Sequence, residues 1–169
     1  TLYRLRDRGE IVCISRGVFQ LVNADAQIAS PDYAAVKERV GDGVLCLISA
    51  LYHHNLTTEI PRKIHLAINR NRHIPRIDYP AVKFYRMSES HFNAGIEKML
   101  IGGVEMNIYS AEKTIADSFK YRDKIGIDTA VEALKNYISR GGYSMSKLME
   151  MAQVCRVGKV IKPYLEAIL

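Results

Sequence analysis

The segment 104–122, which reads V-E-M-N-I-Y-S-A-E-K-T-I-A-D-S-F-K-Y-R, constrains the fold of this chain more than any other stretch. Its first six residues alternate between the two faces of a strand, which predicts a half-buried strand. Ser110 follows at the position of a helix N-cap, where its hydroxyl can accept a hydrogen bond from the first turn. Ala111, Ile115 and Phe119 then repeat every four residues and predict one apolar helix face. The chain must therefore pass from strand to helix with almost no loop.

The remaining sequence divides at this segment into two kinds of structure. Before it the patterns predict mainly short strands and loops with two helices, and after it they predict only helices. With 169 residues, of which 48% are hydrophobic and 25% charged, the chain can bury a core. We therefore expect an α+β fold, in which a mixed domain of short β-strands leads into a C-terminal helical bundle. The strands and the helical bundle together are expected to form one domain that spans residues 25–169.

Particular boundaries follow from caps and periodicity. The pair Ser30-Pro31 predicts a helix to about residue 40, and a second helix is expected over 44–54. Alternation predicts strands at 63–69 and 82–87, whereas 89–101 is ambiguous. Helices are expected at 129–140, from about 144 onward, and at 157–169, where Pro163 predicts a kink or a restart.

Composition narrows the location and the partners. No apolar run approaches the roughly 20 residues that span a bilayer, so we expect a cytoplasmic protein without a membrane partner. The three cysteines, Cys13, Cys46 and Cys155, lie far apart in apolar runs and are expected to be buried thiols, with no metal and no cofactor. The net charge of +6 favours an anionic partner, nucleic acid first.

The N-terminal residues 1–24 resemble the second half of a winged helix-turn-helix. Residues 1–9 read as the last turns of a helix, and two short strands at 10–15 and 18–22 flank Arg16-Gly17. In that motif the helix enters the major groove and the wing touches the DNA backbone. The predicted DNA-binding residues are Arg4, Arg6, Arg8 and Arg16. The alternative is an ordinary helix and hairpin with solvated arginines.

The densest basic stretch lies between residues 62 and 76. It contains Arg62, Lys63, His65, Arg70, Arg72, His73 and Arg76. One interpretation is a solvated loop, and the other is a surface that binds phosphate or an acidic protein.

An active site is not expected. Glu112, Lys113 and Asp117 lie close together in sequence. Their helical spacing instead predicts that Glu112 is an acid of the first turn and that Lys113 and Asp117 form a surface ion pair. The sequence contains no phosphate-binding glycine loop, nucleophile elbow or zinc-protease motif. Catalysis on nucleic acid or nucleotides remains the least favoured alternative.

Three blocks of residues, in order, resemble AbiEi-type antitoxins of type IV toxin–antitoxin systems. They are R-L-R-D-R-G-E-I-V-C-I-S-R-G-V-F-Q-L at 4–21, L-I-S-A-L-Y-H-H-N-L-T at 47–57, and Y-S-A-E-K-T-I-A-D at 109–117. The family's winged helix also has helices before the recognition helix, which this sequence does not contain. The sequence is therefore expected to begin inside the DNA-binding domain.

The resemblance implies a fold, two activities and two partners. The winged helix would bind inverted repeats in the operon's own promoter and repress it. The larger domain would counteract a nucleotidyltransferase toxin without a tight complex, in a system linked to abortive infection and phage defence. The expected antitoxic surface consists of Arg62, Lys63, Arg70, Arg72, Arg76 and Lys113. The alternative function is a protein-interaction module that binds an acidic partner without binding DNA.

Overall fold

The structure is a computed structural model that describes residues 11–15, 18–21 and 30–169. It contains two sheets. β1 (Ile11–Ser15) and β2 (Val18–Leu21) pair as an antiparallel hairpin, with Ser15 opposite Val18. This confirms the predicted pairing of the two strands. Residues 1–10, which include the predicted recognition helix, lie outside the described residues.

A five-stranded mixed sheet forms the centre of residues 30–169, in the order β5-β4-β3-β7-β6. Its strands are β3 (Val44–Leu45), β4 (Ile64–Asn69), β5 (Val82–Met87), β6 (Ile96–Ile101) and β7 (Val104–Tyr109). β4 and β5 run parallel, β6 and β7 form an antiparallel hairpin, and the two-residue β3 joins these pairs. The sheet is therefore continuous only through its shortest strand.

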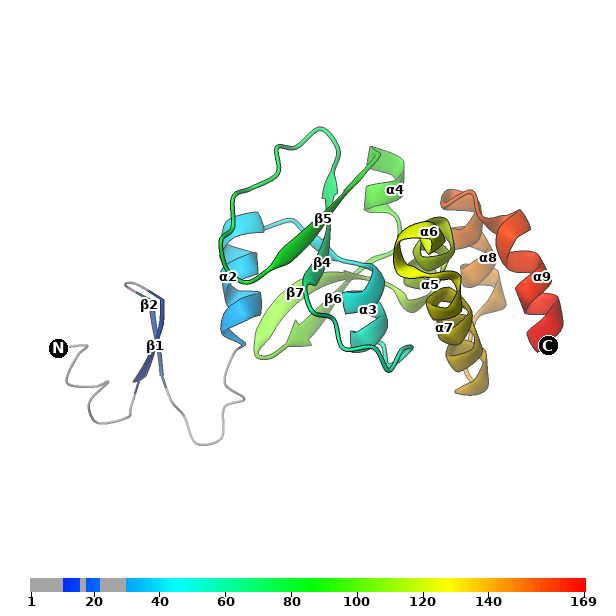
Figure 1. Cartoon of the computed structure of the whole chain (residues 1–169), viewed down its shortest axis with the longest axis horizontal. Coiled ribbons are helices and arrows are strands. Elements are labelled where there is room, and N and C mark those ends of the chain that lie inside the picture. The colour runs from blue at the N-terminus through cyan, green and yellow to red at the C-terminus, as the bar shows by residue number, and fades with distance from the viewer. Residues whose placement is uncertain (1–10, 16–17, 22–29) are drawn as a thin grey trace.

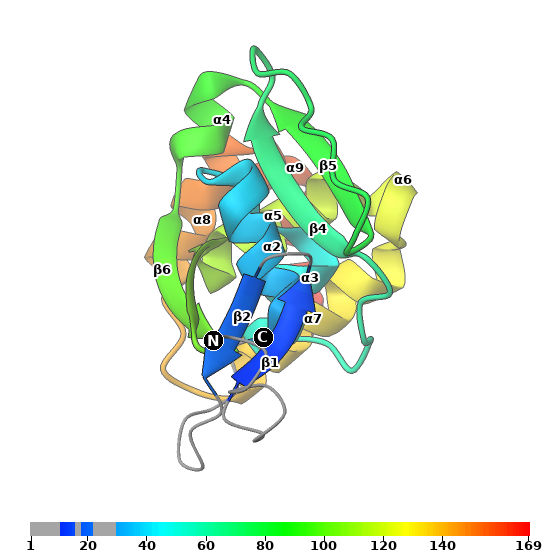
Figure 2. The ribbon, with the colours of Figure 1, turned by 90° about the vertical axis from the view of Figure 1, so that its left-hand side faces the viewer.

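Helices cover both faces of this sheet. One face packs against α2 (Pro31–Val40), with Val36 and Val40 buried against Leu66, Met106 and other strand residues. Beyond the other face lie α3 (Leu47–His53), the short α4 (Glu89–Asn93) and α5 (Ala111–Lys120). Figure 1 shows α2 and the C-terminal helices on opposite sides of the sheet, and Figure 2 shows α2 in front of it.

The predicted C-terminal helical bundle is confirmed. It consists of α5, α6 (Arg122–Ile125), α7 (Ile127–Ser139), α8 (Met145–Val154) and α9 (Gly158–Ile168). Ile115 and Phe119 of α5 are fully buried in a core that also takes residues from α7, α8 and α9. The fold is therefore α+β, as expected. None of the helices in the described residues is long and apolar enough to cross a membrane.

The strand–helix junction at Ser110 is also confirmed. β7 ends at Tyr109, and the Ser110 hydroxyl accepts a hydrogen bond from the Lys113 backbone N–H at 3.2 Å. One other expectation was wrong in detail. The predicted helix over 44–54 begins as strand β3, because Val44 and Leu45 pair with β4 and β7. Of the two outcomes expected at Pro163, a kink or a restart, the restart does not occur, because α9 continues through this residue.

Candidate functional site

The predicted DNA-binding arginines Arg4, Arg6, Arg8 and Arg16 lie outside the described residues. What the structure describes of this region is the backbone pairing of β1 with β2. Their role in DNA binding stays a prediction.

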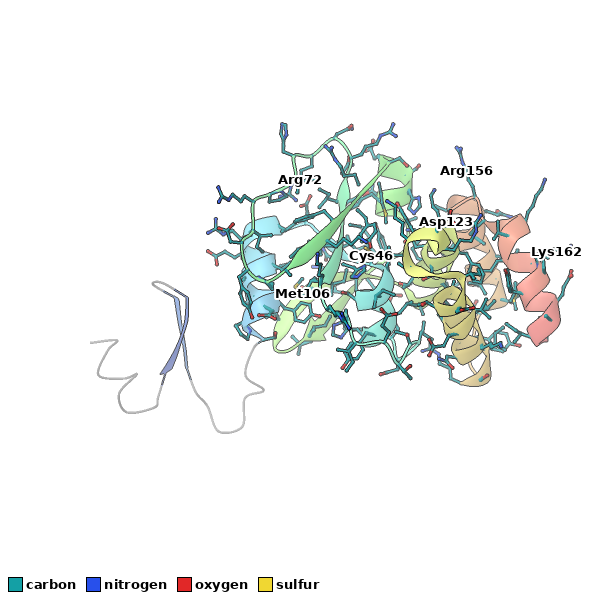
Figure 3. The ribbon with its side chains drawn as sticks, viewed as in Figure 1. Cys46, Arg72, Met106, Asp123, Arg156 and Lys162 are labelled. Atoms are coloured by element: carbon teal, nitrogen blue, oxygen red, sulfur yellow. The ribbon has the colours of Figure 1, made fainter. Side chains whose placement is uncertain are left out.

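The structure divides the basic stretch 62–76 into two parts. In the later part, Arg72 forms an ion pair with Asp42 and donates from Nη1 to the Val40 carbonyl at 2.7 Å. Figure 3 shows Arg72 on the same side of the molecule as α2. The Arg76 Nε lies 3.4 Å from a carboxylate oxygen of Asp78. Arg72 is therefore half-buried and engaged within the protein itself, whereas Arg76, like Arg70 and His73, is exposed.

The earlier part of the stretch lies at a groove that we call the basic groove. Because β4 and β5 are parallel and Ile64 is opposite Val82, the first residues of the two strands lie together. The segment 59–63 and the first turn of α3 complete the groove, whose volume is about 380 Å³. Ile48, Pro61 and Val82 supply its apolar lining.

Positive charge dominates the rim of the basic groove. Arg62, Lys63 and Lys83 are exposed, and none of the three forms an ion pair with another residue in the described part of the chain. Glu59 is the one acidic residue of the lining. Three cations thus face one carboxylate, which makes the groove attractive to anions.

His65 adds hydrogen-bonding capacity to the groove rather than charge. Its burial, together with the charges of Lys83 and Lys63, lowers the pKa of His65 to about 4. The imidazole is therefore neutral near pH 7. Its Nδ1 lies 2.9 Å from the Tyr85 hydroxyl, and the two rings stack with an interplanar angle of 19°.

A second polar cluster, the buried network, surrounds α5. It consists of His91, Lys113, Asp117 and Cys155, with the ammonium group of Lys120 at its border. The Asp117 carboxylate accepts from Lys113 Nζ at 2.6 Å, from His91 Nε2 at 2.6 Å and from the Cys155 thiol at 3.2 Å. Lys113 Nζ also lies 3.9 Å from the centre of the Tyr109 ring, which is a cation–π contact.

The buried network corrects two predictions about α5. Lys113 was expected on the antitoxic surface, but its exposed fraction is 0%. Lys113 and Asp117 are therefore not a surface ion pair. They are turned inward because α5 packs against α3, α7 and α8, so most of its circumference is covered. Lys120 does not pair with Asp117 either; its Nζ lies 3.2 Å from His91 Nδ1.

The ionisation states in the buried network follow from its geometry. Burial alone would raise the pKa of Asp117, but the His91 hydrogen bond and the Lys113 charge outweigh it and hold that pKa below its usual value. A lysine ammonium can only donate, so Lys120 requires His91 Nδ1 to accept. The His91 proton then lies on Nε2 and is donated to Asp117. Burial raises the pKa of Cys155, which keeps the thiol protonated.

This arrangement does not suit a metal ion. His91, Asp117 and Cys155 each offer a ligand atom, and these atoms lie within 4.8 Å of one another. A metal would displace the protons of the imidazole and the thiol, and the Asp117 carboxylate would then lose both of these hydrogen bonds. Two ammonium groups would also repel the cation. The contacts instead satisfy every polar atom of Asp117 and tie α4, α5 and α8 together.

Sequence reasoning missed three residues of these two clusters. Lys83 lies in the basic groove because β5 pairs in parallel with β4, a pairing that alternation within one strand does not reveal. His91 and Cys155 lie far from α5 in sequence and reach Asp117 only through the tertiary fold. Cys46 and Cys155 are buried free thiols, as predicted.

Comparison with known proteins adds no relative. No protein-family model matches the sequence, and no curated protein matches it either. Function must therefore be inferred from the residues and their arrangement.

Proposed function

We propose that this protein is a DNA-binding regulator with antitoxin activity, of the kind that its resemblance to AbiEi-type antitoxins implies. The N-terminal arginines would bind inverted repeats in promoter DNA. The α+β domain would counteract a nucleotidyltransferase toxin.

One observation carries the DNA-binding half of this proposal. β1 and β2 pair as an antiparallel hairpin, and the sequence between their paired ends Ser15 and Val18 is Arg16-Gly17. A basic residue in that connection, directly after the arginine-rich residues 4–8, suits a wing that contacts phosphates. The net charge of +6 supports the same interpretation.

The arrangement of α5 limits where the antitoxic surface can lie. In the block Y-S-A-E-K-T-I-A-D, Ser110 caps the helix, while Lys113 and Asp117 are fully buried. These three residues therefore stabilise the fold, and the block leaves few side chains that could contact a partner. Arg62, Lys63, Arg70 and Arg76 are exposed and, with the half-buried Arg72, remain the proposed antitoxic residues.

Promoter binding tests the regulatory half. In a gel-shift titration of the full-length protein on its own promoter, affinity should fall steeply as salt rises, because phosphate contacts release counterions. Arg16→Ala should weaken binding to all sequences about equally and reduce the salt slope by about 1. Arg156→Ala, an exposed arginine in the C-terminal region, is the matched control and should leave binding unchanged. A loss confined to one operator base would contradict a wing contact, and absent salt dependence would contradict DNA binding.

Growth rescue tests the antitoxic half. Co-expression with the toxin encoded beside it should restore growth, and Arg62→Gln combined with Lys63→Gln and Arg70→Gln should weaken the rescue at equal protein level. A stable complex with an acidic protein that survives nuclease treatment, together with absent promoter binding, would favour the interaction module instead.

A further inference from the structure

We infer that the basic groove binds a nucleoside phosphate, either as a free nucleotide or as an unpaired nucleotide of a single strand. The site is formed by the exposed cations Arg62, Lys63 and Lys83 together with the apolar lining residues Ile48, Pro61 and Val82. It is separate from the arginines proposed to bind promoter DNA, and the inference does not depend on that binding.

The charge of the rim selects an anionic group. Arg62 and Lys63 are adjacent in sequence, and Lys83 joins them because it lies opposite His65 in the parallel pair of β4 and β5. The three side chains remain exposed, and no carboxylate in the described part of the chain neutralises them. Arg72 and Arg76, by contrast, each have an acidic partner. A phosphate provides several acceptor oxygens for such a group of donors.

The lining of the groove indicates which chemical group is attached to the phosphate of the ligand. The half-buried Pro61 and Val82 present apolar surface over the buried Ile48, and the neutral His65 ring offers a nitrogen for a hydrogen bond. A planar base that is both apolar on its faces and polar at its edge matches this combination. The volume of about 380 Å³ lies at the lower end of the range for small-ligand sites, which suits one nucleotide.

The same features disfavour two other anions. In double-stranded DNA the base faces are stacked inside the helix and cannot contact the apolar lining of the groove. An acidic peptide spreads its carboxylates along an extended chain, whereas the three cations here line one compact space. An unpaired nucleotide places its phosphate and base within the dimensions of this single groove.

The test is binding of defined probes to the whole chain. Isothermal titration would use ATP, a 12-nucleotide single-stranded RNA, a 12-base-pair DNA duplex of unrelated sequence and a poly-glutamate peptide. The test variant combines Arg62→Gln, Lys63→Gln and Lys83→Gln. The control combines Arg39→Gln, Lys124→Gln and Lys159→Gln, which removes the same charge from exposed residues outside the groove. Both variants should show the circular dichroism spectrum of the wild type.

We expect the wild type and the control to bind ATP or the single-stranded RNA, and the test variant to bind at least about 30-fold more weakly, since each charge-assisted hydrogen bond is worth roughly tenfold. ATP binding would identify a free nucleotide as the ligand, and RNA binding without ATP binding would identify an unpaired nucleotide of a strand. In amide NMR spectra of the wild type, the bound probe should shift residues 59–65 and 82–83 most.

Three results would overturn the inference. The first is absence of binding by both ATP and the single-stranded RNA. The second is an equal loss of binding in the test and control variants, which would indicate general charge attraction. The third is binding of only the duplex or the poly-glutamate peptide through the groove. Failure of promoter binding is measured separately with Arg16→Ala, so it would leave this inference standing.

Discussion

Replacing Lys113 by Met should destabilise the protein far more than an ordinary lysine replacement on a helix. The ammonium group is fully buried, lies 2.6 Å from the Asp117 carboxylate and contacts the Tyr109 ring. Met retains an apolar stem of similar length, so the main loss is the charge partner of a buried carboxylate. Breaking such a pair costs about 3–5 kcal/mol. The whole free energy of unfolding of a domain is about 5–15 kcal/mol, so the effect is large.

The C-terminal helix supplies a matched control. Lys162 and Glu166 have the same i,i+4 spacing on α9, but their side chains are 70% and 68% exposed and their charged atoms are 3.8 Å apart. Lys162→Met should therefore cost no more than about 0.5 kcal/mol. Urea unfolding followed by circular dichroism measures both variants. With an m-value of about 2 kcal/mol/M, Lys113→Met should lower the midpoint by roughly 2 M and Lys162→Met by less than about 0.3 M.

The double variant Lys113→Met/Asp117→Asn separates charge from packing. Because Asn carries no charge, no unpaired ion remains buried, and the double variant should cost at least about 2 kcal/mol less than the sum of the two single variants. If the single costs simply add, or if Lys113→Met costs no more than Lys162→Met, the interpretation of a buried charge pair is wrong.

Three further predictions follow from α5 and its surroundings. The pKa of Asp117 is lower in the folded than in the unfolded protein. The stabilisation that its carboxylate contributes is therefore present above about pH 4 and is lost as the pH falls through the folded pKa. When unfolding is measured over a series of acid pH values, the free energy of unfolding should fall less steeply for Asp117→Asn than for the wild type. Ser110→Ala should cost about 1 kcal/mol in urea unfolding, whereas Ser88→Ala should cost little, because Ser88 precedes α4 without a side-chain cap bond. Gly95→Ala should destabilise more than Gly141→Ala. Both glycines have positive φ, but a Cβ at 95 would lie 2.8 Å from Lys113 Cβ, whereas one at 141 meets nothing within 4 Å; equal costs would exclude the clash.

Local patterns predicted the elements whose signals lie within one stretch of chain. The apolar repeat at Ala111, Ile115 and Phe119 and the cap at Ser110 located α5 correctly. The alternation at 63–69 located β4, although more of that strand is buried than alternation implies, because helices cover both faces of the sheet. These features depend on neighbouring residues, so the sequence contains their full signal.

The clusters of functional interest depend on distant pairings instead. The orientation of Lys113 could not be derived from spacing, because an i,i+4 lysine–aspartate pair reads the same on a buried and an exposed helix face. Its burial depends on α3, α7 and α8 packing around α5. The basic groove was predicted only in part, since Arg62 and Lys63 were identified while Lys83 required knowledge that β4 and β5 are parallel.

The two-residue strand β3 has a consequence for how the chain folds. Its residues pair with β7, so that Val44 lies opposite Asn107, and this contact joins segments that are far apart in sequence. The hairpin β6–β7 pairs only neighbouring residues and closes a short loop. Short loops cost less entropy to close, so residues 96–109 are expected to be structured in the folding transition state before β3 completes the sheet. Met99→Ala, which removes the cross-strand contact with Met106, should then slow refolding, whereas Val44→Ala should mainly accelerate unfolding.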